Sequence, residues 1–77
     1  MLNQIKAVLQ NKAGKIVESD VYGSTYMVWY GDNGLAVRVF CGAEGVRVRV
    51  TKASATVKQW KSVSENIDEV LAYIAGL

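Results

Sequence analysis

The feature that most constrains the fold is the stretch from residue 15 to residue 60, in which valines recur at alternate positions between short glycine-containing turns. Val46, Val48 and Val50 alternate with arginines, as in a strand with one buried side and one solvent-facing side. Turn-forming pairs, among them Asn33-Gly34 and Gly42-Ala43, divide the stretch into short segments. The pattern predicts five strands, at about 15–22, 25–31, 35–41, 45–51 and 55–60.

Apolar residues at helical spacing flank this stretch on both sides. They predict a helix over residues 2–12, which ends before Gly14, and a second helix over residues 63–75, which ends at Gly76. Residues 62–65 have the pattern of a capping box and are expected to open the second helix. Short loops join antiparallel neighbours, so we predict a single α+β domain over residues 1–77. In this domain a five-stranded antiparallel meander sheet is flanked by an N-terminal and a C-terminal helix.

Composition argues against most catalytic and metal sites. The 77 residues are 51% hydrophobic and 21% charged, which is typical of one folded domain, and they include no histidine, no proline and one cysteine. The commonest general base, the commonest metal ligand and any internal disulfide are therefore missing. Cys41 is expected to be a small buried hydrophobe, and Glu18 and Asp20 have no cleft in which to act as a catalytic pair. The sequence predicts no enzyme, no cofactor and no metal site.

The sequence also bears on the compartment. The first residues, with Lys6 among them, lack the continuous apolar run of a secretory signal, and no later run approaches the length of about 18 residues that a membrane span needs. A lone cysteine is compatible with a reducing environment. We therefore expect a soluble, cytoplasmic protein with no membrane association.

The apolar pattern also predicts which side chains share a face of the sheet. A two-residue Asn33-Gly34 turn would place Tyr30 opposite Val37 and Val28 opposite Val39, on a core face that both helices cover. Loops with an even number of residues keep the apolar alternate positions of each further strand on this same face. The opposite face would then hold Glu18, Asp20 and Tyr22 at one side and an aromatic-basic group made of Met27, Trp29, Arg38, Phe40, Arg47, Arg49, Lys58 and Trp60.

This aromatic-basic group is the candidate functional site. Residues 35–62 carry a net charge of +5, and Trp, Tyr and Arg are the residues most enriched at interface hot spots. We therefore predict a non-catalytic protein-interaction module, a small adaptor, an inhibitor or a homodimer, anchored by Trp29, Arg38 and Arg47. The alternative is a single-stranded nucleic-acid-binding domain that uses the same side chains. A third possibility is purely structural, with the first helix covering this face or with tryptophans and arginines stacked on each other.

Overall fold

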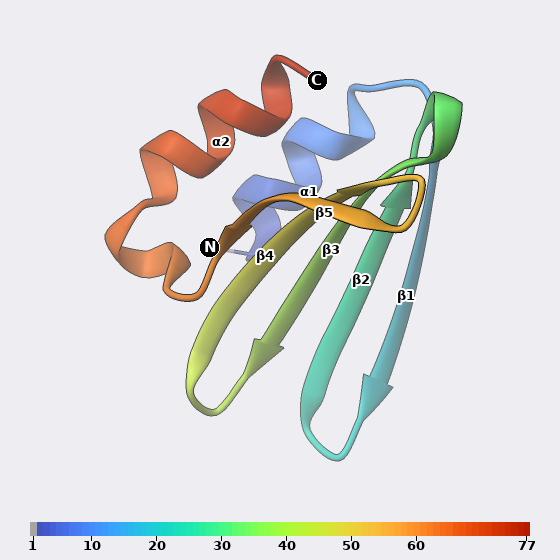
Figure 1. Cartoon of the computed structure of the whole chain (residues 1–77). Coiled ribbons are helices and arrows are strands. Elements are labelled where there is room, and N and C mark those ends of the chain that lie inside the picture. Colours follow the sequence, from blue (N-terminus) through green and yellow to red (C-terminus); the bar gives the residue numbers. More distant parts are fainter. Residues whose placement is uncertain (1) are drawn as a thin grey trace.

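The computed structural model describes residues 2–77 and has the predicted α+β architecture. In chain order the elements are α1 (Leu2–Gln10), β1 (Lys15–Val21), β2 (Ser24–Tyr30), the 3-10 turn Asp32–Gly34, β3 (Leu35–Gly42), β4 (Gly45–Lys52), β5 (Ala55–Trp60), the 3-10 turn Val63–Glu65 and α2 (Ile67–Ala75) (Figure 1). Neither α-helix in residues 2–77 is long and apolar enough to cross a lipid bilayer.

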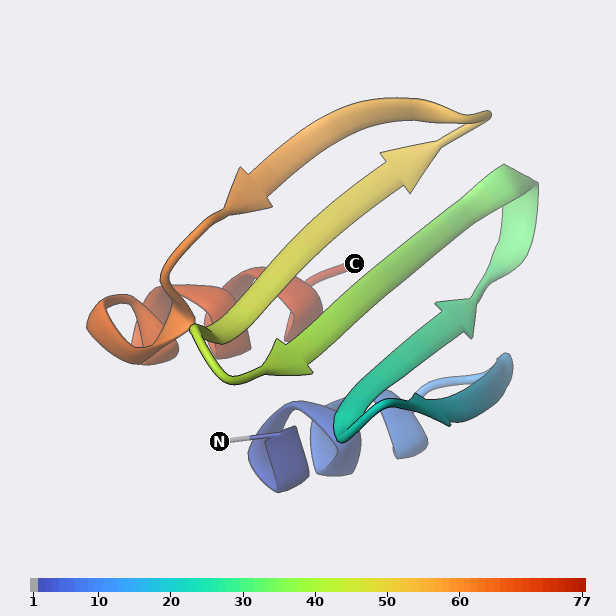
Figure 2. The same ribbon diagram turned by 90° about the horizontal axis from the view of Figure 1, so that it is seen from below.

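The five strands form one antiparallel sheet in the order β1-β2-β3-β4-β5, which confirms the predicted meander. Both helices lie on the same face of this sheet (Figures 1 and 2). The other face, which we call the open face, has no helix over it. The expectation that both helices pack on the valine-rich face is confirmed, because Ile5 and Leu9 of α1 and Val70 and Ile74 of α2 belong to one buried cluster with the valines of β3 and β4.

The start of the second helix differs from the prediction. Residues Val63–Glu65 form a 3-10 turn, and α2 begins only at Ile67, with no side-chain cap. The predicted capping box does not form. The side-chain Nδ2 of Asn66 instead donates to the carbonyl oxygen of Ser62 at 2.9 Å, which holds the turn against the start of the helix.

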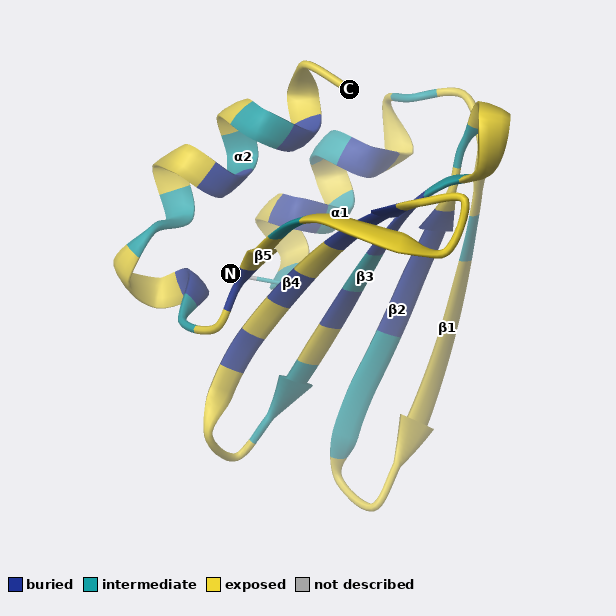
Figure 3. Ribbon diagram, viewed as in Figure 1, coloured by how far each residue is buried: buried dark blue, intermediate teal, exposed yellow. Residues whose placement is uncertain are grey.

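The core consists of alternate strand residues that face the helices. Full burial of one such side chain stabilises a fold by about 1.5–3 kcal/mol relative to exposure, before entropy is counted. The alternation is visible along β4, where buried and exposed residues follow each other (Figure 3). The buried cluster contains Ile5, Leu9, Met27, Trp29, Val37, Val39, Val46, Val48, Val50, Trp60, Val63, Val70 and Ile74. Cys41 packs against this cluster but is only half-buried.

The predicted face of β2 is wrong because three residues, Asp32–Gly34, rather than the expected two lie between the facing residues Gly31 and Leu35. The amide of Gly31 donates to the carbonyl oxygen of Leu35 at 2.8 Å, and Tyr30 lies opposite Ala36 rather than Val37. A shift of one residue moves every side chain of a strand to the other face. Met27 and Trp29 therefore point into the core, whereas Tyr26, Val28 and Tyr30 lie on the open face.

The predicted face of β5 is wrong for a related reason. The pairing of β4 with β5 is irregular between Val50 and Thr51, where Val50 lies opposite Lys58 and Thr51 lies opposite Thr56. This bulge inserts Val57 as an extra residue and reverses the alternation beyond it. Trp60 is consequently buried opposite Val48.

Candidate binding surface

The open face is built from rows of residues that lie opposite one another on neighbouring strands. The central row crosses all five strands and consists of Val17, Val28, Arg38, Arg49 and Gln59. The row on one side of it consists of Ser19, Tyr26, Phe40 and Arg47, and the row on the other side consists of Lys15, Tyr30, Ala36, Thr51 and Thr56. Aromatic residues thus lie on β2 and β3, and arginines lie on β3 and β4.

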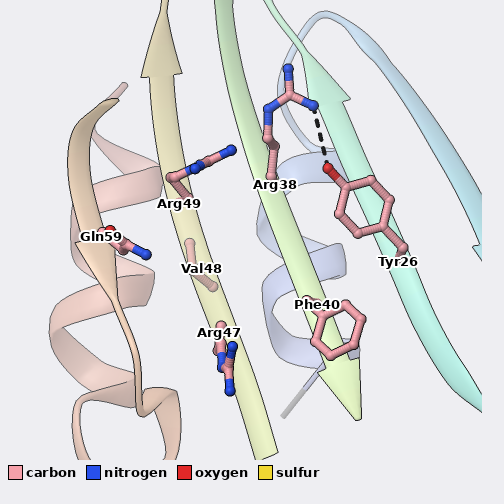
Figure 4. Close-up of a pocket in the computed structure, with 7 residues that line it drawn as sticks. All are labelled: Tyr26, Arg38, Phe40, Arg47, Val48, Arg49 and Gln59. Carbon is pink, nitrogen blue, oxygen red and sulfur yellow. Dashed lines mark hydrogen bonds between the residues drawn. The ribbon is translucent and has the colours of Figure 1, made fainter. Parts of the chain in front are cut away.

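We call six of these residues the arginine–aromatic patch: Tyr26, Tyr30, Arg38, Phe40, Arg47 and Arg49. Five of them, all except Tyr30, line a shallow, open hollow of about 150 Å³ together with Val48 and Gln59 (Figure 4). Tyr30 and Phe40 remain 44% and 40% exposed, although both are large apolar rings. The patch therefore offers aromatic surface and positive charge to solvent at the centre of the sheet.

Arg38 is held in place by an aromatic neighbour. Its Nη1 donates to the hydroxyl of Tyr26 at 3.3 Å, across from β3 to β2. This hydrogen bond is the main cause of a pKa for the Arg38 guanidinium above its usual value, and Tyr30 adds a smaller contribution of the same sign. The side chain is half-buried, and the hydrogen bond to Tyr26 fixes the position of its positive charge.

The strand residues of the open face include positive charges but no negative ones. Lys15, Arg38, Arg47 and Arg49 lie on the open face, to which no strand contributes a carboxylate.

The two acidic residues of β1 lie in helix-facing rows instead. Glu18 pairs with Lys6 of α1 at 2.6 Å, and Asp20 accepts a hydrogen bond from Thr25 at 2.9 Å. The placement of Glu18 and Asp20 beside the aromatic-basic group was therefore wrong.

An acidic residue, Glu44 in the turn between β3 and β4, lies next to the patch. Glu44 lies 3.0 Å from Arg47, and both side chains are largely exposed. Exposed ion pairs of this kind contribute about 0–1 kcal/mol and break easily. Within residues 2–77, Arg38 and Arg49 form no ion pair. Two of the three arginines are thus free to receive an anionic group.

The structure brings together only part of the predicted site. Arg38, Phe40, Arg47 and Arg49 lie side by side on the open face, as expected. The remaining members were assigned to the wrong face: Met27, Trp29 and Trp60 are buried in the core, with exposed fractions of 0%, 3% and 5%.

Lys58 is also on the helix side. Its Nζ lies 3.7 Å from Glu69 of α2 and 5.4 Å from the ring centroid of Trp60.

The sequence reasoning missed Tyr26, Tyr30 and Gln59, which the structure adds to this surface. The residues from Tyr26 to Tyr30 are apolar or aromatic at every position, so alternation alone does not decide which side is buried. The phenol hydroxyls were the available signal, because a tyrosine usually keeps its polar end in contact with water or with a hydrogen-bond partner. Both tyrosines follow this rule, since the hydroxyl of Tyr26 accepts a hydrogen bond from Arg38 and Tyr30 is exposed.

The patch combines three arginines with three aromatic rings. No group of three or more cysteine, aspartate or glutamate side chains in residues 2–77 converges on a point where a metal ion could bind. The patch itself contains no carboxylate or thiol, and the chain has no histidine.

The chain matches no protein-family model, and no curated protein or solved structure is significantly similar to it.

Proposed function

We propose that this protein is a non-catalytic binding module whose contact surface is the arginine–aromatic patch and whose partner is negatively charged. The observation that carries the proposal is that the strands place positive charges and no carboxylate on the open face. Arg38, Arg47 and Arg49 are gathered on a face to which no strand contributes a carboxylate. A surface of one sign raises the local concentration of partners of the other sign and speeds their association.

The cost of this arrangement supports a functional origin. Arg38 lies directly opposite Arg49, and like charges in that position destabilise a sheet. Tyr30 and Phe40 also remain exposed beside them, although burial of either ring would be favourable. Arginine and tyrosine are both enriched where proteins contact their partners.

The same charge argues against a homodimer through this face. A two-fold symmetric contact places the same surface patch of both copies together. The arginines of one copy would then face the arginines of the other, and Glu44 already pairs with Arg47 of its own copy. Self-association through the patch is therefore disfavoured, and the partner is expected to be a different, anionic molecule.

Chromatography on immobilised heparin, a polyanion, tests the proposal. A double variant, Arg47→Ala with Arg49→Ala, removes two positive charges from the open face. The matched control, Lys52→Ala with Lys58→Ala, removes two positive charges from residues that lie in helix-facing rows. Both variants have the same net charge, so a difference between them reports on the location of the charge.

We expect the arginine double variant to elute at clearly lower salt than the lysine double variant, with unchanged far-ultraviolet circular dichroism for both. Equal elution of the two variants would contradict the proposal, because retention would then follow net charge alone.

A further inference from the structure

We infer that the anionic ligand of the arginine–aromatic patch is a single-stranded nucleic acid, with bases stacked on the rings of β2 and β3 and phosphates held by the arginines of β3 and β4. This inference rests on the proposed function and specifies the class of partner. The observation behind it is that rings and cations occupy adjacent strips of the same exposed face.

The aromatic strip provides surfaces for stacking. Tyr26 and Phe40 lie directly opposite each other on neighbouring strands, and Tyr30 lies four residues farther along β2, about 13 Å away by the rise of a strand. Every base has a flat face, so stacking on such rings is tolerant of sequence. Stacking also requires unpaired bases, which a single strand offers and a duplex does not.

The basic strip lies beside the aromatic one. Arg49 and Arg47 follow each other on the open face of β4. Arg38 lies between Arg49 and Val28, the residue of β2 that separates the two tyrosines. A nucleic-acid strand has its bases on one side and its phosphates on the other, so a neutral strip next to a basic strip matches that asymmetry. Gln59, at the rim of the hollow, and the hydroxyl of Tyr26 add groups that can hydrogen-bond to base edges.

An acidic protein would fit the same charge but fits the rest of the surface less well. Protein hot spots are large side chains that insert into well-packed pockets. Both tryptophans of this chain are buried in its own core, and the hollow on the open face is shallow, with a volume of about 150 Å³. The patch is also at the centre of the sheet, where each strand is already paired on both sides, so it offers no edge to which a peptide could add as a further strand.

Duplex DNA is disfavoured by shape. Its major groove admits a helix or a narrow two-stranded ribbon, whereas the patch spans the middle of a five-stranded sheet. Both helices lie on the opposite face (Figure 2).

Fluorescence anisotropy with labelled oligonucleotides of about 12 nucleotides tests the inference, since single-strand sites of this general type cover about 4–16 nucleotides. The probes are oligodeoxythymidine, oligouridine and a duplex of the same length, each titrated at several salt concentrations. We expect both single strands to bind more tightly than the duplex. Three phosphate contacts predict a slope of about −2 for log K against log salt, because each contact to a single strand contributes about −0.7.

A variant and its control test the contribution of stacking while the net charge of the protein stays the same. Phe40→Leu keeps an apolar side chain and the net charge but removes the ring, and it should weaken single-strand binding about 5- to 150-fold. Tyr22→Leu is the matched control, because Tyr22 is a fully exposed aromatic in the turn between β1 and β2, outside the patch. That change should leave the affinity within about twofold. If Phe40→Leu fails to fold, amide chemical-shift mapping of the unmodified protein supplies the answer, with shifts expected in β2, β3 and β4.

The outcomes distinguish this inference from the proposed function. If heparin retention depends on the arginines but the single strands bind no better than the duplex, or no better than oligoglutamate, the nucleic-acid inference is wrong and the binding function stands. An unchanged affinity in Phe40→Leu would overturn the inference in the same way. If neither heparin nor any oligonucleotide responds to the arginines, both proposals fail.

Discussion

Arg38 and Arg49 lie directly opposite each other on β3 and β4, and neither forms an ion pair with a carboxylate of residues 2–77. Such a like-charge pair opposes folding, whereas an opposite-charge pair at the same position stabilises it. We therefore predict that Arg49→Glu is more stable than the unmodified protein by about 0.5–1 kcal/mol, as measured by urea unfolding. The same variant should lose retention on heparin.

Arg47→Glu is the control for this prediction. Arg47 lies opposite Phe40 and already pairs with Glu44 at 3.0 Å, so reversal of its charge creates a repulsion instead of removing one. We expect no gain in stability from Arg47→Glu. A loss of stability in Arg49→Glu would show that the two guanidinium groups do not repel each other appreciably.

A second prediction concerns the packing of Trp29 against the backbone. A methyl group added at Gly31 would overlap with the six-membered ring of Trp29, which is buried. Overpacking of this kind costs about 1–3 kcal/mol, so Gly31→Ala should lower the free energy of unfolding by that amount.

Gly76→Ala serves as the comparison, because the nearest atom to the added methyl would be a carbonyl oxygen at an ordinary distance of 3.6 Å. Its effect should stay within about 0.5 kcal/mol. Equal stabilities of the two variants would mean that the ring moves away from Gly31 without cost.

The elements of the fold could be predicted from the sequence because their signals are local. Alternating valines and arginines define β4, and glycine-containing turns separate the first four strands from one another. The face of β2 could not be predicted, because Tyr26, Val28 and Tyr30 on one side are as apolar as Met27 and Trp29 on the other. One additional residue in the connection determines which face of β2 is buried. A three-residue 3-10 turn, Asp32–Gly34, replaces the expected two-residue turn.

The predicted faces of the candidate-site residues are correct on β3 and β4 and wrong on β2 and β5. Arg38, Phe40, Arg47 and Arg49 belong to β3 and β4, whose faces follow from the valine pattern, and the face predicted for these four residues is correct. Trp60 belongs to β5, where a bulge opposite Val50 reverses the alternation. Strand propensity does not reveal such a bulge, since Val57 and Lys58 both fit a strand.

A third prediction follows from the burial of the tryptophans. Trp29 and Trp60 are 3% and 5% exposed, and Trp60 packs edge-on against Tyr73 with ring centroids 5.3 Å apart. Their emission should resist quenching by acrylamide and should not change when a ligand binds to the open face. Strong quenching in the folded state would contradict the burial of both rings.

The same burial changes the expected role of Trp29. Truncation of a buried tryptophan costs about 3–5 kcal/mol, which is most of the stability of a small domain. Trp29→Ala should therefore unfold the protein or leave it marginally stable, as measured by circular dichroism. A stable Trp29→Ala variant with weakened binding would instead restore Trp29 as an interface anchor.

A fourth prediction concerns pH. The contacts of the proposed site are made by arginines, which lose their charge only above about pH 12, and the chain has no histidine. The hydrogen bond to Tyr26 raises the pKa of Arg38 further, and a raised pKa extends the range in which a basic group stays charged toward higher pH. The affinity for single-stranded oligonucleotides, measured by anisotropy at constant salt, should therefore be flat between about pH 6 and pH 9. A steady fall of affinity across this range would contradict the assignment of the phosphate contacts to arginines.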